Sequence, residues 1–121
     1  MAINKLHEEF RNIDMAAGWS LPEGYPPDAL AEEKILSGAL DHKMKRGSRT
    51  RLLRFKPGFL TYAPFVHDYW EEVFLLQGDM IVGGESFKGY TYCVRPPGVY
   101  HGPFKSEDGA LLLEVHYFDP V

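Results

Sequence analysis

Two short stretches of this sequence contain side chains of the types that can bind metal ions. The first runs through Phe65, His67, Tyr69 and Glu71, which are spaced two residues apart. If this stretch is extended, its side chains alternate between two faces, so these four residues share one face and Glu72 lies on the other. The spacing therefore favours Glu71 over Glu72 as the partner of His67.

The face that carries His67 and Glu71 continues into Val73 and Leu75, which predicts that it points into the core. A buried imidazole or carboxylate is costly without a partner, and a metal ion is such a partner. In the second stretch, a Pro-Pro-Gly turn directly precedes the segment with His101 and would hold it on stiff backbone. Two imidazoles and one carboxylate suit Fe(II) and are also compatible with Zn, Mn, Ni or Co. We therefore expect one divalent metal ion at His67, Glu71 and His101.

The elements that must position these residues are short apolar runs separated by glycine and proline. The expected strands are residues 50–55, 59–65, 70–76, 80–82, 90–94 and 111–118, with turns at 56–58, 77–79, 83–85 and 96–98. Many short strands with frequent turn signals are typical of an all-β sandwich or barrel. No room remains for a parallel α/β arrangement.

The N-terminal part lacks this pattern of short apolar runs. We therefore divide the chain into an arm, residues 1–33, and a barrel, residues 34–121. Ile3, Leu6, Phe10 and Ile13 are three or four residues apart, which favours a short helix, although a strand could equally begin near residue 12. Residues 18–28 contain three prolines and two glycines and cannot continue a helix or a central strand. We expect an extended strap over the barrel or over a neighbouring subunit.

The composition limits the kinds of molecule that this protein is expected to bind. A net charge of −4 gives no attraction to nucleic acid or to an anionic membrane, so the partner is expected to be a small molecule or another protein. Cys93 is the single cysteine, which excludes an intrachain disulfide and fits a reducing compartment. The sequence has neither a signal-peptide pattern nor a long apolar run, and we expect a cytoplasmic protein.

Two further features are given structural interpretations. The basic stretch 43–56 is interpreted as a charged edge strand rather than an anion-binding strip, because no aromatic residues are interleaved with it. Glu114 and His116 alternate on the last expected strand. They could be groups that support the metal ligands or an extra pair of ligands, but we expect their face to be partly solvated and the face of Leu113, Val115 and Tyr117 to point toward the core.

The two metal-binding stretches resemble the paired motifs of the cupin superfamily. The positions that match are Gly58, His67, Glu71 and Gly78 for the first motif, and Gly89, Pro96, Gly98 and His101 for the second. The resemblance spans residues 49–118, and the tract 67–118 is also similar to the cupin domain of ChrR-type anti-sigma factors. It implies an all-β, double-stranded β-helix, which is a jelly-roll-like barrel.

The chain departs from the cupin pattern at one ligand position. Phe65 stands where the family usually has the first histidine of a His-x-His pair, and Lys105 stands where some members have Asn or Gln. The remaining three ligands would leave coordination positions open for substrate and oxygen. Phe65 would then shape the pocket, with Tyr69 and Tyr92 as further pocket-lining residues.

The resemblance favours a metal-dependent enzyme, and among such enzymes a mononuclear non-heme iron dioxygenase that acts on a small carbonyl or phenolic compound. A metal-dependent isomerase, lyase or hydrolase is compatible with the same residues. Two alternatives remain outside catalysis: a small-molecule-binding or sensor module, and a metal-free structural cupin. Cupins are commonly dimers and the strap is long enough to exchange between subunits, so we expect a homodimer.

Overall fold

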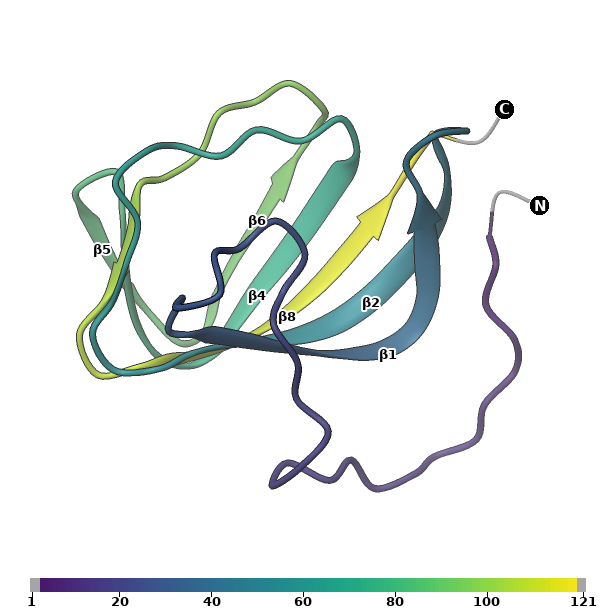
Figure 1. Cartoon of the computed structure of the whole chain (residues 1–121), viewed down its shortest axis with the longest axis horizontal. Helices are drawn as coiled ribbons and strands as arrows, with labels where there is room; N and C mark the ends of the chain where they lie inside the picture. Colours follow the sequence, from purple (N-terminus) through teal and green to yellow (C-terminus); the bar gives the residue numbers. More distant parts are fainter. Residues whose placement is uncertain (1–2, 120–121) are drawn as a thin grey trace.

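The computed structural model describes residues 3–119, which form strands and no helix. Figure 1 shows an antiparallel sheet that curls into a half-open barrel, with the N-terminal arm running outside it. Within the described residues, no helix is long and apolar enough to cross a membrane. The strands are β1 (Ala31–Asp41), β2 (Arg46–Phe55), β3 (Phe59–Leu60), β4 (Trp70–Val82), β5 (Glu85–Lys88), β6 (Thr91–Arg95), β7 (Phe104–Ser106) and β8 (Ala110–Tyr117).

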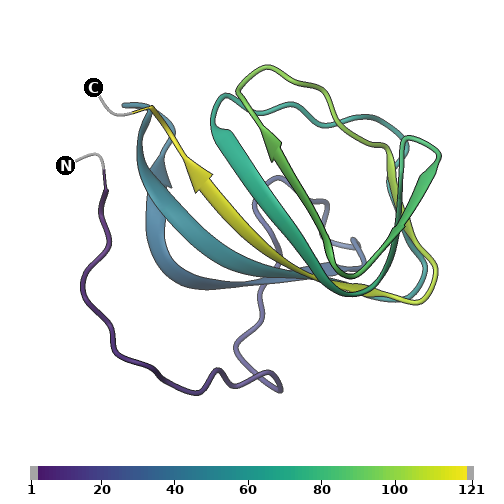
Figure 2. The same cartoon turned by 180° about the vertical axis from the view of Figure 1, so that it is seen from behind.

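The longest strand, β4, joins the two parts of the barrel. Its first half pairs with β8 and β6, which lie on either side of it (Figure 2), and its second half pairs with β5 and β7. The register shifts between Leu75 and Gln77, and Gly78 has a φ of 87°. A Cβ at Gly78 would collide with the carbonyl oxygen of Gly109, so this position needs glycine. The predicted turn at 77–79 is therefore wrong, because the backbone bends there without reversing.

The other expected strands are found with different ends. The strand expected at 59–65 is only Phe59–Leu60, and β4 merges two expected strands into one. The sequence analysis did not predict β1, β5 or β7. Their short or strongly charged sequences, such as Ala-Glu-Glu-Lys at the start of β1, lack the apolar runs on which the predictions depended. The sheet also begins at Ala31, three residues before the expected start of the barrel at residue 34.

The arm has neither of the two structures expected for its first part. Residues 3–14 form no helix and no strand, and the side chains of Ile3, Leu6 and Phe10 are exposed, so they have no apolar face to pack against. Polar contacts hold this segment to the barrel instead, including one of 2.6 Å from Lys5 Nζ to Thr50 Oγ1. The arm is therefore extended along the outside of the sheet.

The strap covers the barrel of its own chain. Ser20 pairs with Glu33 of β1 in an isolated bridge, and the ring of Tyr25 stacks on Phe65 at a centroid distance of 5.8 Å. Tyr25 also packs beside Phe59, at the edge of the apolar core. These contacts place Tyr25 inside the barrel, where burial raises the pKa of its hydroxyl.

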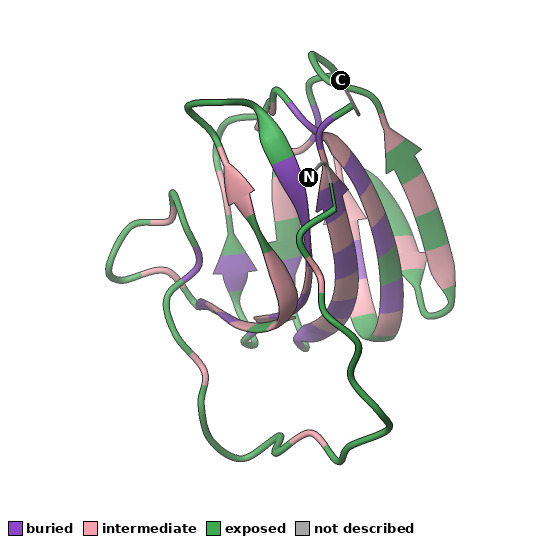
Figure 3. Cartoon of the chain, turned by 90° about the vertical axis from the view of Figure 1, so that its right-hand side faces the viewer, coloured by how far each residue is buried: buried purple, intermediate pink, exposed green. Residues whose placement is uncertain are grey.

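Side chains that face the barrel interior change character along the strands. At one end they form the apolar core, where the rings of Phe55 and Phe59 stack 3.9 Å apart. Toward the other end of the same strands the inward positions are polar. Figure 3 shows the strands banded by burial; buried and partly buried residues alternate along β8, whereas β2 has runs of three buried residues. One end of the barrel is therefore filled by an apolar core, and the inward side chains at the other end can form a polar site.

The structure corrects two sequence-based interpretations at the polar end. Glu114 and His116 are 5% and 0% exposed, so the face expected toward solvent points inward. The basic stretch is not an edge strand, because β2 lies between β1 and β8, and Arg49 and Arg51 are buried. The interpretation of Glu114 and His116 placed the apolar face of the last strand toward the core. Here the buried arginines and the buried acid and imidazole compensate one another across two neighbouring strands.

Candidate metal centre

A cavity of about 590 Å³ occupies the polar end of the barrel. Its lining combines an apolar part, which includes Phe65 and Phe104, with a polar part that includes His67, Glu71 and His101. The three residues expected to bind a metal ion therefore face one cavity. Phe65 and Tyr69 line the same cavity, as expected from their shared face.

Three different segments bring these side chains together. Glu71 lies near the start of β4, with its side chain on the inward face. His101 follows the predicted turn at residues 96–98 and forms an isolated antiparallel bridge with Phe65, with N···O distances of 2.7 and 2.9 Å. The carbonyl oxygen of His67 accepts a hydrogen bond of 2.9 Å from Gly98 N. The two sequence motifs are thus tied to each other through backbone hydrogen bonds.

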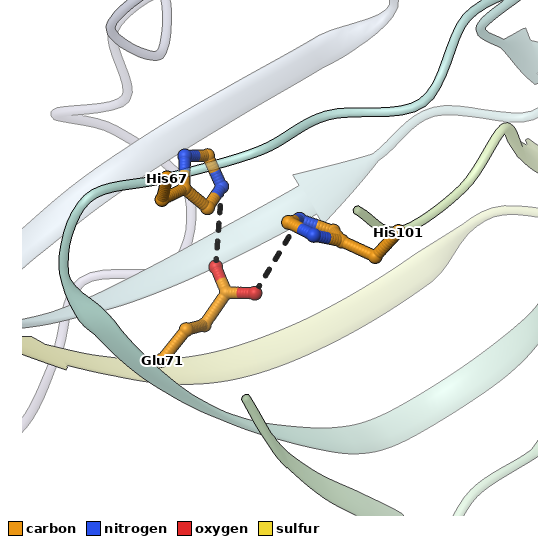
Figure 4. A group of neighbouring side chains, drawn as sticks. All are labelled: His67, Glu71 and His101. Carbon is orange, nitrogen blue, oxygen red and sulfur yellow. Dashed lines mark ion pairs between the residues drawn. The ribbon is translucent and has the colours of Figure 1, made fainter. Parts of the chain in front are cut away.

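The two imidazoles converge on the Glu71 carboxylate, as Figure 4 shows. His67 Nε2 lies 3.8 Å from Glu71 Oε2, and His101 Nε2 lies 3.6 Å from Glu71 Oε1. One nitrogen or oxygen atom from each residue lies within 4.8 Å of the others. Ligands about 2.1 Å from a shared ion, in adjacent positions, are about 3 Å apart, so the separations in this set would shorten by at most about 2 Å around an ion.

The hydrogen bond of His101 and the burial of His67 determine how each ring could bind a metal ion. His101 Nδ1 lies 3.2 Å from the carbonyl oxygen of Val99, which can only accept, so Nδ1 carries a hydrogen and Nε2 is the nitrogen that faces Glu71. Burial lowers the pKa of His67 to about 4, so this ring is neutral near pH 7. A neutral imidazole is the form that binds a metal ion.

Two further side chains hold the Glu71 carboxylate. Arg95 Nη1 lies 2.9 Å from Oε1, and His116 Nε2 lies 3.1 Å from Oε2. Arg49 Nε donates to His116 Nδ1 over 3.0 Å, so His116 Nδ1 accepts, and Nε2 carries the hydrogen that is donated to Glu71. Strand register places Arg49, His116, Glu71 and Arg95 side by side on β2, β8, β4 and β6. This polar row fixes the orientation of the expected metal-binding carboxylate.

Comparison with known families identifies the fold. A family model described as "ChrR Cupin-like domain" matches residues 31–117, from the first residue of β1 to the last of β8. This chain belongs to that cupin family. The predicted all-β cupin fold is thereby confirmed. A comparison with curated proteins found no match.

Solved structures with the same architecture include other cupins. An RmlC-like cupin from Shewanella frigidimarina is 15% identical with a TM-score of 0.67, and 93% of each chain is covered. An acetylacetone dioxygenase from Acinetobacter johnsonii is 19% identical with a TM-score of 0.62 over 97% of this chain and 79% of that one. The complex of Rhodobacter sphaeroides SigE with the anti-sigma ChrR contains a chain that is 17% identical, with a TM-score of 0.58 over 87% of this chain and 51% of that one. At these identities the likeness shows the fold alone.

A second group in this cupin, Glu71, Glu114 and His116, is also close enough to hold an ion. Its polar atoms already have protein partners. Arg51 contacts Glu114 Oε1 through both Nε and Nη2, at 2.8 and 2.7 Å, and the hydrogen on His116 Nε2 blocks that nitrogen as a ligand. Burial raises the pKa of Glu114, but the charge of Arg51 and the contact with His116 outweigh this and lower it. The first group is therefore the better candidate metal site.

The structure does not place Tyr92 in the cupin cavity. Its side chain is on the outer face of β6, and its hydroxyl donates to Glu72 Oε1 over 2.6 Å. The prediction that Tyr92 lines the pocket is wrong because residues of β6 alternate, and Cys93 and Arg95 occupy the inward positions. Sequence analysis missed the supporting role of Arg49 and Arg51. Their alternation on β2, opposite Glu114 and His116 on β8, was the available signal.

Proposed function

We propose that this cupin binds one divalent metal ion through His67, Glu71 and His101 and acts as a mononuclear iron dioxygenase on a small carbonyl or phenolic compound. The observation that carries the proposal is the convergence of these three donors on one wall of a cavity large enough for a small organic molecule. Two imidazoles and one carboxylate suit Fe(II). When bound, this ion would supply a redox-active Lewis acid with open coordination positions.

The residues of this chain have defined tasks in the proposed reaction. His116 and Arg95 hold the carboxylate of Glu71, and His67 presents a neutral ring. Phe65, with Tyr25 stacked on it, forms an apolar wall beside both histidines and would exclude water from the substrate. The similarity in fold to an acetylacetone dioxygenase supports a small carbonyl compound as one class of substrate.

Oxygen uptake tests the proposal directly. Fe(II)-loaded protein would be supplied with β-diketones, catechols and hydroxyacetophenones, and we expect one class to be consumed together with oxygen. His101→Ala should abolish the uptake, since it removes one of three ligands. A substrate converted without oxygen use would instead show a metal-dependent isomerase, lyase or hydrolase.

One observation favours a second candidate, a ligand-binding sensor without catalysis. The matching family model is that of the ChrR cupin-like domain, and the solved ChrR is an anti-sigma protein in complex with SigE. A sensor would use the same cavity to bind a small molecule and would pass the change to a protein partner. Compounds that raise the melting temperature of the metal-loaded protein without being consumed would support this role.

We also propose that the protein is a cytoplasmic homodimer. The side chains of Phe10 and Leu6 on the arm, and of Phe74 and Val94 on the outer face of β4 and β6, are exposed in the isolated chain. Exposed apolar surface of this kind is typical of an interface. The single free cysteine, Cys93, supports a reducing compartment.

A further inference from the structure

Three arginines line the cavity, and two of them each contact two protein side chains. Arg51 contacts Glu33 over 2.7 Å on one side and Glu114 on the other. Arg49 donates to His116 and lies 3.5 Å from Glu23. Their guanidinium groups therefore neutralise and orient side chains of the protein itself. Arg95 differs from both.

Arg95 has one side-chain partner among residues 3–119. Nη1 contacts Glu71 Oε1 at 2.9 Å, which accounts for one of the five N–H donors of the guanidinium. The side chain is 18% exposed and lines the cavity beside the three candidate ligands. Its remaining donors are therefore available to water or to a molecule that enters the cavity.

The charge balance around Arg95 depends on what Glu71 binds. A metal ion on Glu71 would share the negative charge that now balances Arg95, and His116 already supports the other carboxylate oxygen. Three other acidic side chains line the cavity. Glu114 is paired with Arg51, and Glu23 and Asp68 are half-exposed and contact His42 and Lys45, respectively. An occupied site would therefore have an excess of positive charge next to Arg95.

We propose that Arg95 binds a carboxylate group of the substrate, so that among small carbonyl and phenolic compounds the cavity binds those that carry a carboxylate more tightly than their neutral analogues. This inference rests on the proposed metal site, because it places the substrate between the ion and Arg95. The planar guanidinium suits a carboxylate, to which it can donate two parallel hydrogen bonds. The apolar wall formed by Phe65 and Phe104 would receive the hydrocarbon part of the acid. A phenolic acid combines both features.

Salicylate and its neutral analogue salicylamide provide matched probes. Each would be titrated calorimetrically into protein loaded with Zn(II), which allows binding without oxidation. We expect salicylate to bind the wild-type protein at least about tenfold more tightly than salicylamide. In Arg95→Gln this preference should fall by about tenfold or more, because a charge-assisted pair of hydrogen bonds is lost. The ratio of the two affinities is the readout, because Arg95 also contacts Glu71 and its replacement changes the site for both probes.

Arg46→Gln is the control, since it removes the same charge from an exposed position outside the cavity and should keep the preference. Circular dichroism would verify folding. If Arg95→Gln does not fold, Arg95→Lys provides the test, because it keeps a positive charge near Glu71 and loses the planar group. That variant should also lose most of the preference.

The possible failures are distinguishable. If the wild-type protein takes up no Zn(II), the proposed metal site fails, and the same titrations of metal-free protein decide the role of Arg95. Equal affinities for the two probes, no binding of salicylate, or a preference that survives in both Arg95 variants would overturn the inference.

Discussion

Glu71 is the residue on which the proposed site depends, and hydrogen bonds reach its carboxylate from two neighbouring strands. His116, on β8, is one donor and is itself oriented by Arg49 on β2. Sequence parity identified Glu71 but misplaced His116, because a period of two shows which residues share a face and not which face is buried. The face that carries His116 is buried because its charged groups are compensated by arginines on β2. This compensation depends on the pairing of strands that are far apart in the sequence.

The role of His116 leads to a prediction about metal affinity. Replacing His116 with Phe removes the hydrogen bond to Glu71 and should weaken binding by about 10- to 100-fold, as expected for a group that orients a ligand. Competition with a fluorescent chelator would measure the change. Tyr117→Phe is the control, since its hydroxyl contacts Glu72 on the outer face. An unchanged affinity in a folded His116→Phe protein would contradict this role.

His67 predicts a pH dependence of stability for the metal-free protein. Burial lowers its pKa to about 4 from an ordinary value of about 6.5, so the folded state favours the neutral ring. The stabilisation is therefore complete above about pH 6.5 and is lost as the pH falls toward 4. Urea unfolding across this range should show the loss, and His67→Gln should show less of it. Identical pH profiles would exclude His67 as the cause.

At the scale of elements, the bend in β4 allows one strand to serve both parts of the barrel. The sequence predicts a turn at Gly78. Glycine at a positive φ occurs in turns and in bulges alike, so the residue type alone does not distinguish them. The hydrogen-bonded pairing of β4 with its neighbouring strands, on both sides of Gly78, shows that the strand continues through this position, next to a register shift, and does not form a turn. The fold class and the strands rich in apolar residues were predictable, whereas β1, β5 and β7 depend on tertiary partners more than on their own composition.

Gly78→Ala should destabilise the protein by roughly 1–3 kcal/mol, because the new Cβ meets the Gly109 carbonyl and the positive φ becomes strained. Gly84→Ala is a matched control. It has the same φ of 87° but no atom within 4 Å of the added Cβ. Urea unfolding should therefore find a larger loss at position 78. Equal losses would mean that the close approach of β4 to Gly109 contributes little.

On the scale of the whole molecule, the barrel has an apolar core at one end and a polar cavity at the other, and its outer surface retains exposed aromatic and aliphatic groups. The core closes the barrel without using the polar residues. This division explains how a chain of 121 residues can bury four charged side chains in β2, β4 and β8 and keep a continuous core.

The exposed apolar groups predict self-association. Light scattering coupled to size exclusion should give twice the chain mass of 13.8 kDa. Phe74→Glu would place a charge on the exposed outer face of β4 and should shift the protein toward monomer if that face is the interface. A wild-type monomer at working concentration would contradict the dimer.

Metal content tests the central claim most directly. Protein purified without a histidine tag and offered Fe(II), Mn, Ni and Zn in turn would be analysed by mass spectrometry for bound metal, together with His67→Ala and His101→Ala. The three-ligand site predicts close to one ion per chain in the wild-type protein and a large loss in both variants. Wild-type protein that retains none of these ions, or variants that retain as much as the wild type, would contradict it.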